Sequence, residues 1–337
     1  MRTLVTGATG FVGSQVMDQL LARGEGVRAL VREPARAAAL RARGVEVALG
    51  DVRDLAVVQA AVRGVRVIHH CAAAVGPHFS KREIYATNLG GVRNVLEALS
   101  RQRAGRLVLL SSINVLGTRN LDPATEDLPC RRSADPGADV KIAAEALAHD
   151  YHQRGVDVTI LRPGFIYGPG DPHNLPRLAR AIRRGGFAYL GSPANVVPIV
   201  HVSDVAQAML LAAAAPAAAG RAYHVSDGSR TTAAQFVGRL AELLGCPPPE
   251  KVVPYSVAYL GCVLFEWLGR LHLRRGPGPI NRPALRFLGT SRFVDIRRAR
   301  EELGYTPRVG YYEGLADAAS RLGEHSYEPA SAAVPSA

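Results

Sequence analysis

Hydrophobic residues in the first half of the chain form short runs that alternate with segments of helical periodicity. The apolar runs occupy residues 3–5, 27–31, 45–48, 65–71, 106–110 and 156–161. Segments with a helical pattern lie at 11–23, 34–43, 54–63, 82–102 and 139–154. Short buried runs separated by helices are typical of parallel strands with crossover helices. The pattern therefore predicts an α/β fold with a Rossmann-type, doubly wound parallel sheet and a ligand site at the carboxyl ends of its strands.

The composition of the chain changes after Arg162, since residues 163–172 are rich in proline and glycine. We expect a dinucleotide-binding domain at 1–165 and a smaller substrate-binding region at 166–324, with segments that return to the sheet. In the second region, residues 200–202 are predicted to form a strand, and the Ser203-Asp204-Val205 sequence is predicted to cap and begin a helix. Residues 325–337, mostly Ser, Pro and Ala, are expected to be a disordered tail.

The first apolar run leads directly into a glycine-rich turn, TGATGFVG at residues 6–13, which opens a helical pattern. The first glycine permits a tight turn, the second lets the backbone approach a pyrophosphate, and the third allows close packing of helix on strand. The helix N-terminus offers free N–H groups to the anion. A tight turn with no ligand is the alternative, but the order of strand, turn and helix favours a dinucleotide. The expected contacts are Gly7, Thr9, Gly10, Phe11, Val12 and Gly13.

The end of the second predicted strand indicates which nicotinamide cofactor is used. An acidic residue there would bind the ribose 2′-hydroxyl of NAD, whereas an arginine accommodates the 2′-phosphate of NADP. Here the strand ends at Val31 and Arg32 follows, with Arg36 one helical turn later. We therefore expect NADP, with NAD as the alternative if Arg32 is only a solvated loop residue.

Composition limits the classes of partner. The formal net charge of +12 comes almost entirely from arginine, since Lys81, Lys141 and Lys251 are the only lysines among 41 basic residues. A basic surface attracts anions, but no nucleic-acid-binding motif is present, so nucleic acid is not an expected partner. The four cysteines form no CxxC pair, so no metal site is expected. Isolated cysteines and the absence of a secretory signal pattern favour a cytoplasmic protein.

Residues 252–268 form an uncharged stretch until Glu266, rich in apolar and aromatic side chains and followed by Arg270, Arg274 and Arg275. The stretch is shorter than the roughly 20 residues needed to span a bilayer. It can pack as a core helix, or it can lie on a membrane surface with its basic flank toward anionic lipid. Peripheral membrane contact is thus one of two expectations for this segment.

Several motifs in sequence order resemble one family over residues 1–318. They are TGATGFVG at 6–13, GDVRD at 50–54, CAAA at 71–74, TNLGGVRN at 87–94, LLSSINVLG at 109–117, RPGFIYGPGD at 162–171 and a closing pattern at 293–315. The chain resembles the extended short-chain dehydrogenase/reductases, specifically the branch of NAD-dependent epimerases/dehydratases and 3β-hydroxysteroid dehydrogenases. The resemblance implies cofactor contacts at Asp51, Val52, Ala72, Ala73, Ala74, Asn88, Lys141 and Pro163. It also implies that Ser112 is the catalytic serine.

One residue departs from the family pattern. The family places a tyrosine four positions before the lysine that corresponds to Lys141, and the lysine lowers the pKa of its hydroxyl for proton transfer. This chain has Gly137 there, without any gap in the alignment. Either another group or water supplies the proton, or the substrate needs little acid help, or the protein binds the nucleotide without catalysis. Candidates for the other group are His78, Tyr85, Asp139 and Tyr167.

The resemblance predicts an enzyme that transfers hydride between NADP(H) and an alcohol or ketone, with lipophilic, sterol-like compounds favoured as substrates. The alternatives are a nucleotide-sugar epimerase or dehydratase, and a catalytically degenerate NADP-binding scaffold. The expected partner is a small-molecule substrate, and assembly into a homodimer is one possibility.

Overall fold

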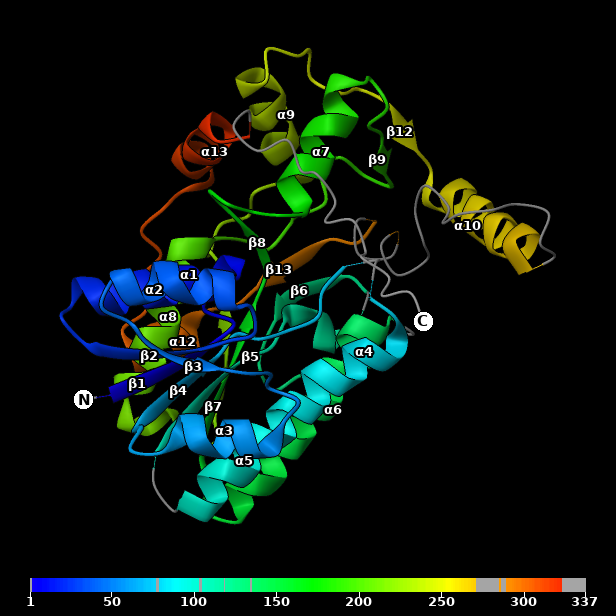
Figure 1. The fold of residues 1–337 in the computed structure, drawn as a ribbon. Helices are drawn as coiled ribbons and strands as arrows, with labels where there is room; N and C mark the ends of the chain where they lie inside the picture. The colour runs from blue at the N-terminus through cyan, green and yellow to red at the C-terminus, as the bar shows by residue number, and fades with distance from the viewer. Residues whose placement is uncertain are drawn as a thin grey trace, which may run out of the picture.

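The centre of the molecule is a seven-stranded, wholly parallel sheet. The computed structural model describes residues 2–76, 79–102, 105–117, 119–133, 135–270, 285 and 289–322, with residues 265–270 described by their backbone only. The strand order is β11-β7-β5-β4-β1-β2-β3 (Figure 1). The strands are β1 (Arg2–Thr6), β2 (Gly26–Val31), β3 (Glu46–Leu49), β4 (Val67–His70), β5 (Arg106–Leu110), β7 (Asp157–Pro163) and β11 (Ala222–Val225). The predicted α/β, Rossmann-type doubly wound sheet is confirmed.

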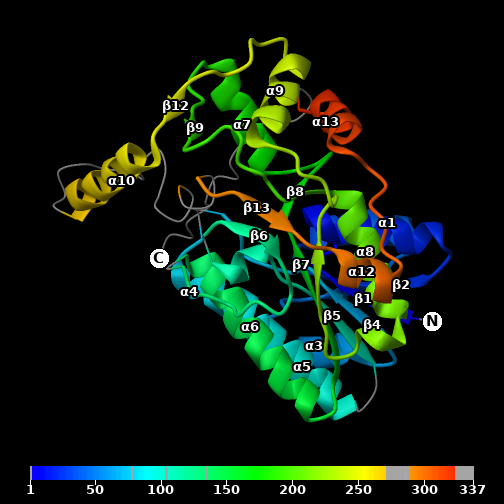
Figure 2. The same cartoon turned by 180° about the vertical axis from the view of Figure 1, so that it is seen from behind.

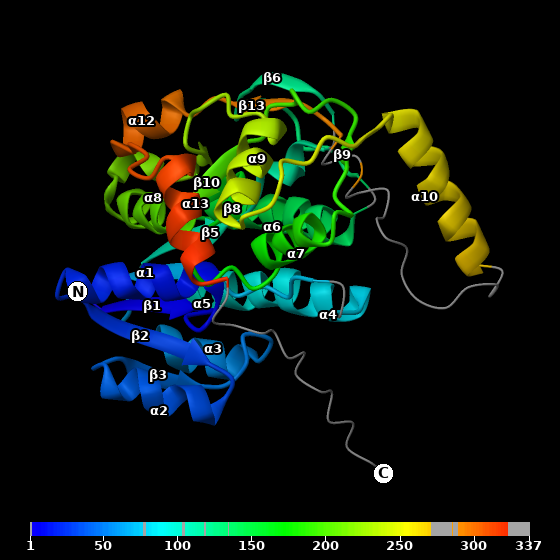
Figure 3. The same cartoon turned by 90° about the horizontal axis from the view of Figure 1, so that it is seen from above.

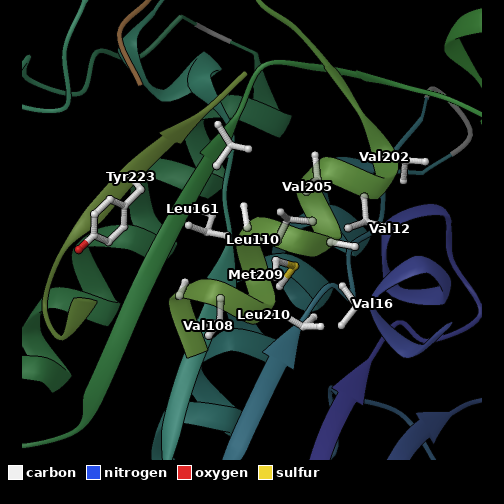
Figure 4. Packing of buried hydrophobic residues seen from close by; sticks show 14 of the residues in the cluster. Val12, Val16, Val108, Leu110, Leu161, Val202, Val205, Met209, Leu210 and Tyr223 are labelled. Atoms are coloured by element: carbon white, nitrogen blue, oxygen red, sulfur yellow. The ribbon is translucent and has the colours of Figure 1, made fainter. Parts of the chain in front are cut away.

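Alternate residues of each strand face opposite sides of the sheet, and each side is covered by its own helices. Leu110 and Val5 pack with α1 (Phe11–Ala22), α2 (Pro34–Ala42) and α8 (Val202–Ala214), as Figure 4 shows for α8. Leu109 and Leu4 pack with α3 (Leu55–Val62), α5 (Gly91–Gln102) and α6 (Pro136–Gln153). A parallel sheet buried on both faces explains why its strands are mostly apolar and show no regular alternation of polar and apolar residues.

The second half of the chain contributes to this sheet and also builds a smaller layer above it. Strand β11 pairs with β7, with Ala222 opposite Ile160, and α8 packs against α1. The smaller layer contains α7 (Asn174–Arg183), α9 (Ala233–Leu243) and α13 (Tyr311–Ser320), with a separate apolar core (Figure 2). Two pairs of short strands lie outside the central sheet. Strand β8 (Phe165–Tyr167), which follows β7 closely, pairs with β10 (Ile199–His201), and β9 (Tyr189–Leu190) pairs with β12 (Val252–Val253).

The remaining elements lie at the edges. Strand β6 (Leu121–Ala124) pairs with β13 (Arg292–Val294), which is followed by α12 (Arg297–Leu303). Short 3₁₀ helices occupy Ile113–Leu116 and Pro216–Ala218. Helix α10 (Tyr255–Arg270) projects away from the rest of the molecule (Figures 1 and 3). Among the described residues, no helix has the length and apolar character needed to cross a membrane.

Two local predictions need correction. The helix expected at 82–102 is divided into α4 (Lys81–Tyr85), a π-helical stretch (Ala86–Gly90) and α5. The helix expected to be capped at Ser203 begins two residues earlier, at Val202, because the His201 side chain accepts a hydrogen bond from the Ser203 N–H and acts as the N-cap of α8. The expected tail at 325–337 lies outside the described residues.

Candidate active site

The glycine-rich turn connects β1 to α1 at the carboxyl end of the sheet. Gly7 has φ +69°, and a Cβ there would lie 2.7 Å from the Ala72 backbone nitrogen. A Cβ at Gly13 would lie 2.1 Å from the Gly7 carbonyl oxygen, so helix and turn touch through backbone alone. Gly10 is the N-cap of α1 and provides no side-chain cap. The first-turn N–H groups of a helix have no intrahelical acceptors and are therefore available to an anion.

Three of the expected contact residues in this turn present different groups to a ligand. Thr9 is exposed, Phe11 is partly buried, and the Val12 side chain is buried in the core between α1 and α8. Val12 can therefore contact a ligand only through its backbone.

Three arginines lie after β2 and β3 near this turn, and two of them are paired with carboxylates: Arg53 with Asp51, and Arg36 with Glu33. The Arg36 guanidinium lies 3.4 Å from the Thr9 carbonyl oxygen, and Arg32 is exposed. Arg53 holds Asp51 through Nε–Oδ1 and Nη2–Oδ2 contacts of 3.0 and 2.7 Å. The hydrogen bonds from Arg53 are the main reason that the Asp51 pKa is lowered, and the charge of Arg32 adds to this effect. An anion at this position would face a local excess of positive charge.

The loop after β4 is held by Asn88 from the π-helical stretch. The Asn88 side chain accepts from the Ala74 N–H at 2.7 Å and donates to the Ala74 carbonyl at 3.1 Å, and it is buried. Both functional groups of this amide are therefore engaged by one backbone unit. Val52, which precedes this loop in the sequence, packs against Gly91, and its carbonyl accepts from the Asn94 side chain at 2.9 Å. Asn88 thus fixes Ala74, and the close approach of the Ala72 backbone to Gly7 places the start of the loop beside the glycine-rich turn.

Helix α6 brings Lys141 to the carboxyl end of β5. Its ammonium donates to the Leu110 carbonyl at 2.5 Å. Burial lowers the pKa of Lys141 to about 8, although nearby Cys71 and Glu145 oppose the shift. Burial also raises the pKa of Cys71 to about 12 and, together with the charge of Lys141, lowers that of His70 to about 3. His70 is thus a neutral imidazole, paired with the Thr6 hydroxyl at 3.0 Å.

Ser112 follows β5 directly and caps the short 3₁₀ helix after it. The Ser112 hydroxyl oxygen accepts from the Asn114 N–H at 3.2 Å, which leaves its own proton free to be donated. Gly137 lies in the first turn of α6, where its N–H donates to the capping Asp135 at 3.2 Å. A Cβ at Gly137 would meet only the Asp135 carboxylate, at 3.6 Å, which is ordinary van der Waals contact. The backbone at this position can therefore carry a larger side chain.

The structure places the candidates for a replacement proton donor in different environments. Tyr167 is wholly buried in the core of the smaller layer, with its ring packed edge-on against Phe236, so it is not a site residue. Asp139 accepts from the Ser133 N–H at 3.0 Å and tethers the segment before α6. Tyr85 is half-buried at the end of α4, which packs against α6. His78 lies outside the described residues.

A buried ion pair behind the site was not predicted from the sequence. Glu145 accepts from Arg162 Nη2 at 2.7 Å and from Arg162 Nε, and both side chains are more than nine-tenths buried. The Ser111 hydroxyl also donates to Glu145. The pair therefore joins α6, β5 and β7 directly beneath Ser112 and Lys141. The available signal was the spacing: Glu145 is four residues after Lys141 and so shares its helical face.

An apolar cavity of about 100 Å³ lies in the smaller layer. Its described lining includes Phe165, Phe187, Tyr189, Phe236 and Val237, from β8, β9, α9 and the segment before β9. Among the described residues, no group of three or more His, Cys, Asp or Glu side chains could hold a metal ion. The residue constellation thus consists of a backbone cradle for an anion, a serine hydroxyl, a buried lysine and an apolar cavity.

Comparisons with known proteins identify a family and several similar reductases. The model of the NAD dependent epimerase/dehydratase family matches residues 3–226. The chain is 32% identical over 317 residues to 4-hydroxy-2-methyl-3-oxo-4-farnesyl-3,4-dihydroquinoline-1-oxide ketoreductase of Stigmatella aurantiaca, covering 94% of this chain and 95% of that protein. It is 32% identical over 329 residues to 2-alkyl-3-oxoalkanoate reductase of Stenotrophomonas maltophilia, covering 94% and 97%.

A solved structure supports the same fold assignment. MoeE5 in complex with UDP-glucose and NAD superposes with a TM-score of 0.74 at 27% identity, covering 96% of this chain and 99% of that one. Similarity therefore extends over both the sheet and the smaller layer.

Proposed function

Because this chain belongs to the NAD dependent epimerase/dehydratase family, we propose that it interconverts a lipophilic ketone and the corresponding alcohol with NADP(H). The predicted extended short-chain dehydrogenase/reductase family and NAD(P)-dependent oxidoreductase type are confirmed. The substrate class, the preference for NADP and the residue roles are proposals. The observation that carries the substrate class is the cavity lined by Phe165, Phe187, Tyr189, Phe236 and Val237.

The residues present fit a dinucleotide. Gly7 and Gly13 leave a cradle that a Cβ would fill, and the first turn of α1 presents N–H groups to the pyrophosphate. Asp51 and Val52 are proposed to contact the adenine, with Ala72, Ala73, Ala74 and Pro163 beside the rest of the molecule. Asn88 acts by holding Ala74. When bound, the nicotinamide supplies or accepts the hydride.

Arg32 and Arg36 support the proposed preference for NADP. Both lie just after β2 near the glycine-rich turn, and Arg32 is exposed. Arg32 can pair with a ribose 2′-phosphate, and position 31, where NAD-binding proteins present an acidic residue to the 2′-hydroxyl, holds a valine. Arg36 is paired with Glu33 at 2.9 Å and would have to exchange that partner for the phosphate.

This preference is tested by titrating NADPH and NADH against wild type, Arg32→Ala and the control Arg41→Ala, which removes an exposed arginine from the last turn of α2. Arg32→Ala should weaken NADPH binding roughly 10-fold or more, the loss of a hydrogen bond to a charged group, and leave NADH unchanged. Equal affinities in the wild type, or an equal loss in Arg41→Ala, would contradict the assignment.

The proposed chemistry uses Ser112 and Lys141. In reduction, the Ser112 hydroxyl donates a hydrogen bond to the substrate carbonyl oxygen, which stabilises the negative charge that develops there. Lys141 binds the nicotinamide ribose hydroxyls and supplies positive charge close to the reacting oxygen. That oxygen must gain a proton as carbon gains the hydride, and we assign the proton to water in the space that Gly137 leaves one turn before Lys141.

The experiment that tests the function is a panel of lipophilic ketones, steroids and nucleotide sugars assayed for NADPH oxidation. The proposal expects turnover of lipophilic ketones and its reduction by Ser112→Ala. Epimerisation and dehydration of a nucleotide sugar return the hydride to the sugar and consume no NADPH, so the nucleotide sugars are also incubated with enzyme and NAD⁺ and their products identified by NMR. Formation of an epimer or a dehydrated sugar, without turnover of any lipophilic ketone, would support the epimerase/dehydratase alternative. Nucleotide binding without turnover of any compound, with activity appearing only in Gly137→Tyr, would support the scaffold alternative.

Helix α10 carries a second proposal, contact with a membrane surface. Val257, Leu260 and Leu264 are 59, 69 and 52% exposed and fall at helical positions i, i+3 and i+7. Figure 2 shows that α10 projects from the rest of the molecule. An apolar stripe on such a helix matches a helix that lies in a lipid interface. Cosedimentation with anionic vesicles should fall strongly in Leu260→Glu and persist in the control Glu250→Gln. Absence of the wild type from the pellet, with a dimer in light scattering that Leu260→Glu dissociates, would assign the stripe to a homodimer instead.

A further inference from the structure

The carboxylate of Asp135 lies beside the position where the family pattern has a tyrosine. Apart from the chain neighbours and the helix backbone, the described atoms nearest to a Cβ built on Gly137 are the two Asp135 carboxylate oxygens, each at 3.6 Å. Side chains on an α-helix lean toward its N-terminus, and Asp135 is the residue that caps the N-terminus of α6. A side chain at position 137 would therefore enter a space that has this carboxylate at its base.

The Asp135 carboxylate is only partly used by the helix that it caps. Its Oδ1 accepts from the Gly137 N–H at 3.2 Å. Within the part of the chain that the structure describes, Oδ2 accepts no hydrogen bond and the carboxylate forms no ion pair. Asp139, by contrast, accepts from the Ser133 N–H at 3.0 Å. Since Asp135 is half-buried, its second oxygen can take a proton from the site and pass it to bulk solvent.

Two contacts hold the start of α6 against the segment that carries Ser112. Lys141 on α6 donates to the Leu110 carbonyl, two residues before Ser112. The Arg131 N–H, ahead of α6, donates to the Val115 carbonyl at 2.7 Å, three residues after the serine. Helix α6 also packs against the 3₁₀ helix that Ser112 caps. The first turn of α6, with its capping carboxylate, therefore lies between two points of attachment that flank the serine.

We propose that Asp135 exchanges a proton, through one water molecule, with the substrate oxygen that Ser112 holds. This inference rests on the proposed ketone/alcohol reaction and specifies its proton path. In alcohol oxidation the substrate O–H bond breaks and its proton passes through the water to Asp135, while the adjacent carbon releases a hydride to NADP⁺. In reduction the protonated Asp135 returns a proton through the water as the carbon gains the hydride. The water is needed because the carboxylate lies at the base of a space that a phenol would cross.

The test separates proton exchange from helix capping. Asp135→Asn removes the proton acceptor but keeps an oxygen that can cap α6, since asparagine caps helices about as well as aspartate. At saturating NADP⁺, kcat for a lipophilic alcohol should fall about 10-fold or more, which allows for the intervening water relative to direct acid–base catalysis. The KM and the melting temperature should stay unchanged. The control Asp150→Asn removes an exposed carboxylate near the other end of the same helix and should keep the wild-type kcat.

A second background supplies a readout that a structural role would not produce. In Gly137→Tyr a phenol occupies the space and can exchange the proton itself, so adding Asp135→Asn to this variant should change kcat by less than about twofold. Loss of a cap would instead lower turnover equally in both backgrounds. If Asp135→Asn does not fold, Asp135→Ser, which also caps, replaces it, and added formate should raise its kcat toward that of wild type.

Three results overturn this inference while leaving the proposed reaction intact. They are an unchanged kcat in Asp135→Asn, an equal fall in both backgrounds, and loss of substrate binding in Gly137→Tyr, which would show that substrate rather than water fills the space. Absence of any turnover by wild type would refute the proposed reaction, and the proton path with it.

Discussion

The buried Glu145–Arg162 pair permits a quantitative prediction about what holds the site together. Glu145→Gln keeps the volume of the side chain but removes its charge, so Arg162 becomes a cation with a side chain 8% exposed and no neutralising partner at 2.7 Å. Breaking a buried pair from one side costs about 3 to 5 kcal/mol. The total stability of a domain is usually about 5 to 15 kcal/mol, so a large part of it would be lost.

The assay is equilibrium unfolding in urea with an exposed pair as control. Asp150 and Arg154 form an i,i+4 pair at the end of the same helix, at 2.6 Å, with side chains 45 and 63% exposed. Asp150→Asn should cost about 0 to 1 kcal/mol because exposed pairs contribute little. Replacing both Glu145 and Arg162 by Met should recover part of the loss. A change below about 1 kcal/mol in Glu145→Gln, or one equal to that of the control, would refute this reasoning.

Three other outcomes are expected. Gly137→Tyr should fold normally, because a Cβ at this position would lie 3.6 Å from the nearest atom, an Asp135 carboxylate oxygen. If water is the proton source, the variant should raise turnover of a small ketone by about 10²- to 10⁴-fold. Loss of substrate binding would instead show that the substrate fills this space. Since the folded pKa of Lys141 is lowered to about 8, the unfolded chain binds more protons between pH 8 and its ordinary value near 10.5. The unfolding free energy of wild type should therefore rise relative to that of Lys141→Met across this interval, and parallel pH curves would disprove it. Gly13→Ala should abolish dinucleotide binding in fluorescence titration because its Cβ would lie 2.1 Å from a carbonyl oxygen, whereas Gly238→Ala, in open space on α9, should keep it.

The sequence predicted most reliably those features that a short segment determines by itself, such as turns and buried strands. The glycine-rich turn and six strands of the central sheet, β1 to β5 and β7, were recognisable because strands of a parallel sheet that is covered on both faces are mostly apolar. Strand β6, which pairs with β13 outside that sheet, was not predicted. Strand β11 was not predicted, since its four residues, Ala222–Val225, resemble any short apolar stretch until β7 is in place beside them. The geometry of a turn is local, whereas the pairing of an edge strand is not.

The sequence analysis did not predict contacts between side chains that are far apart in the sequence. Glu145 and Arg162 belong to different elements, and nothing local shows that they meet. The placement of Tyr167 near the site was wrong because strand β8 turns that side chain into the core of the smaller layer, against Phe236. The same limitation hid the hydrogen bond from Arg292 Nη1 to the Asn114 side-chain oxygen, at 3.3 Å, which joins residues 178 positions apart.

Strand β11 has a consequence for how this chain can be divided or recombined. It is encoded after the smaller layer begins, yet it closes one edge of the central sheet, and α8 covers one of the faces of that sheet. A fragment that ended near residue 165 would leave β7 as an unprotected edge, open to pairing with other chains. The nucleotide-binding half is consequently not a transplantable module. Exchange between relatives must therefore carry residues 202–225 together with the first half, because α8 and β11 complete the sheet that the first half begins.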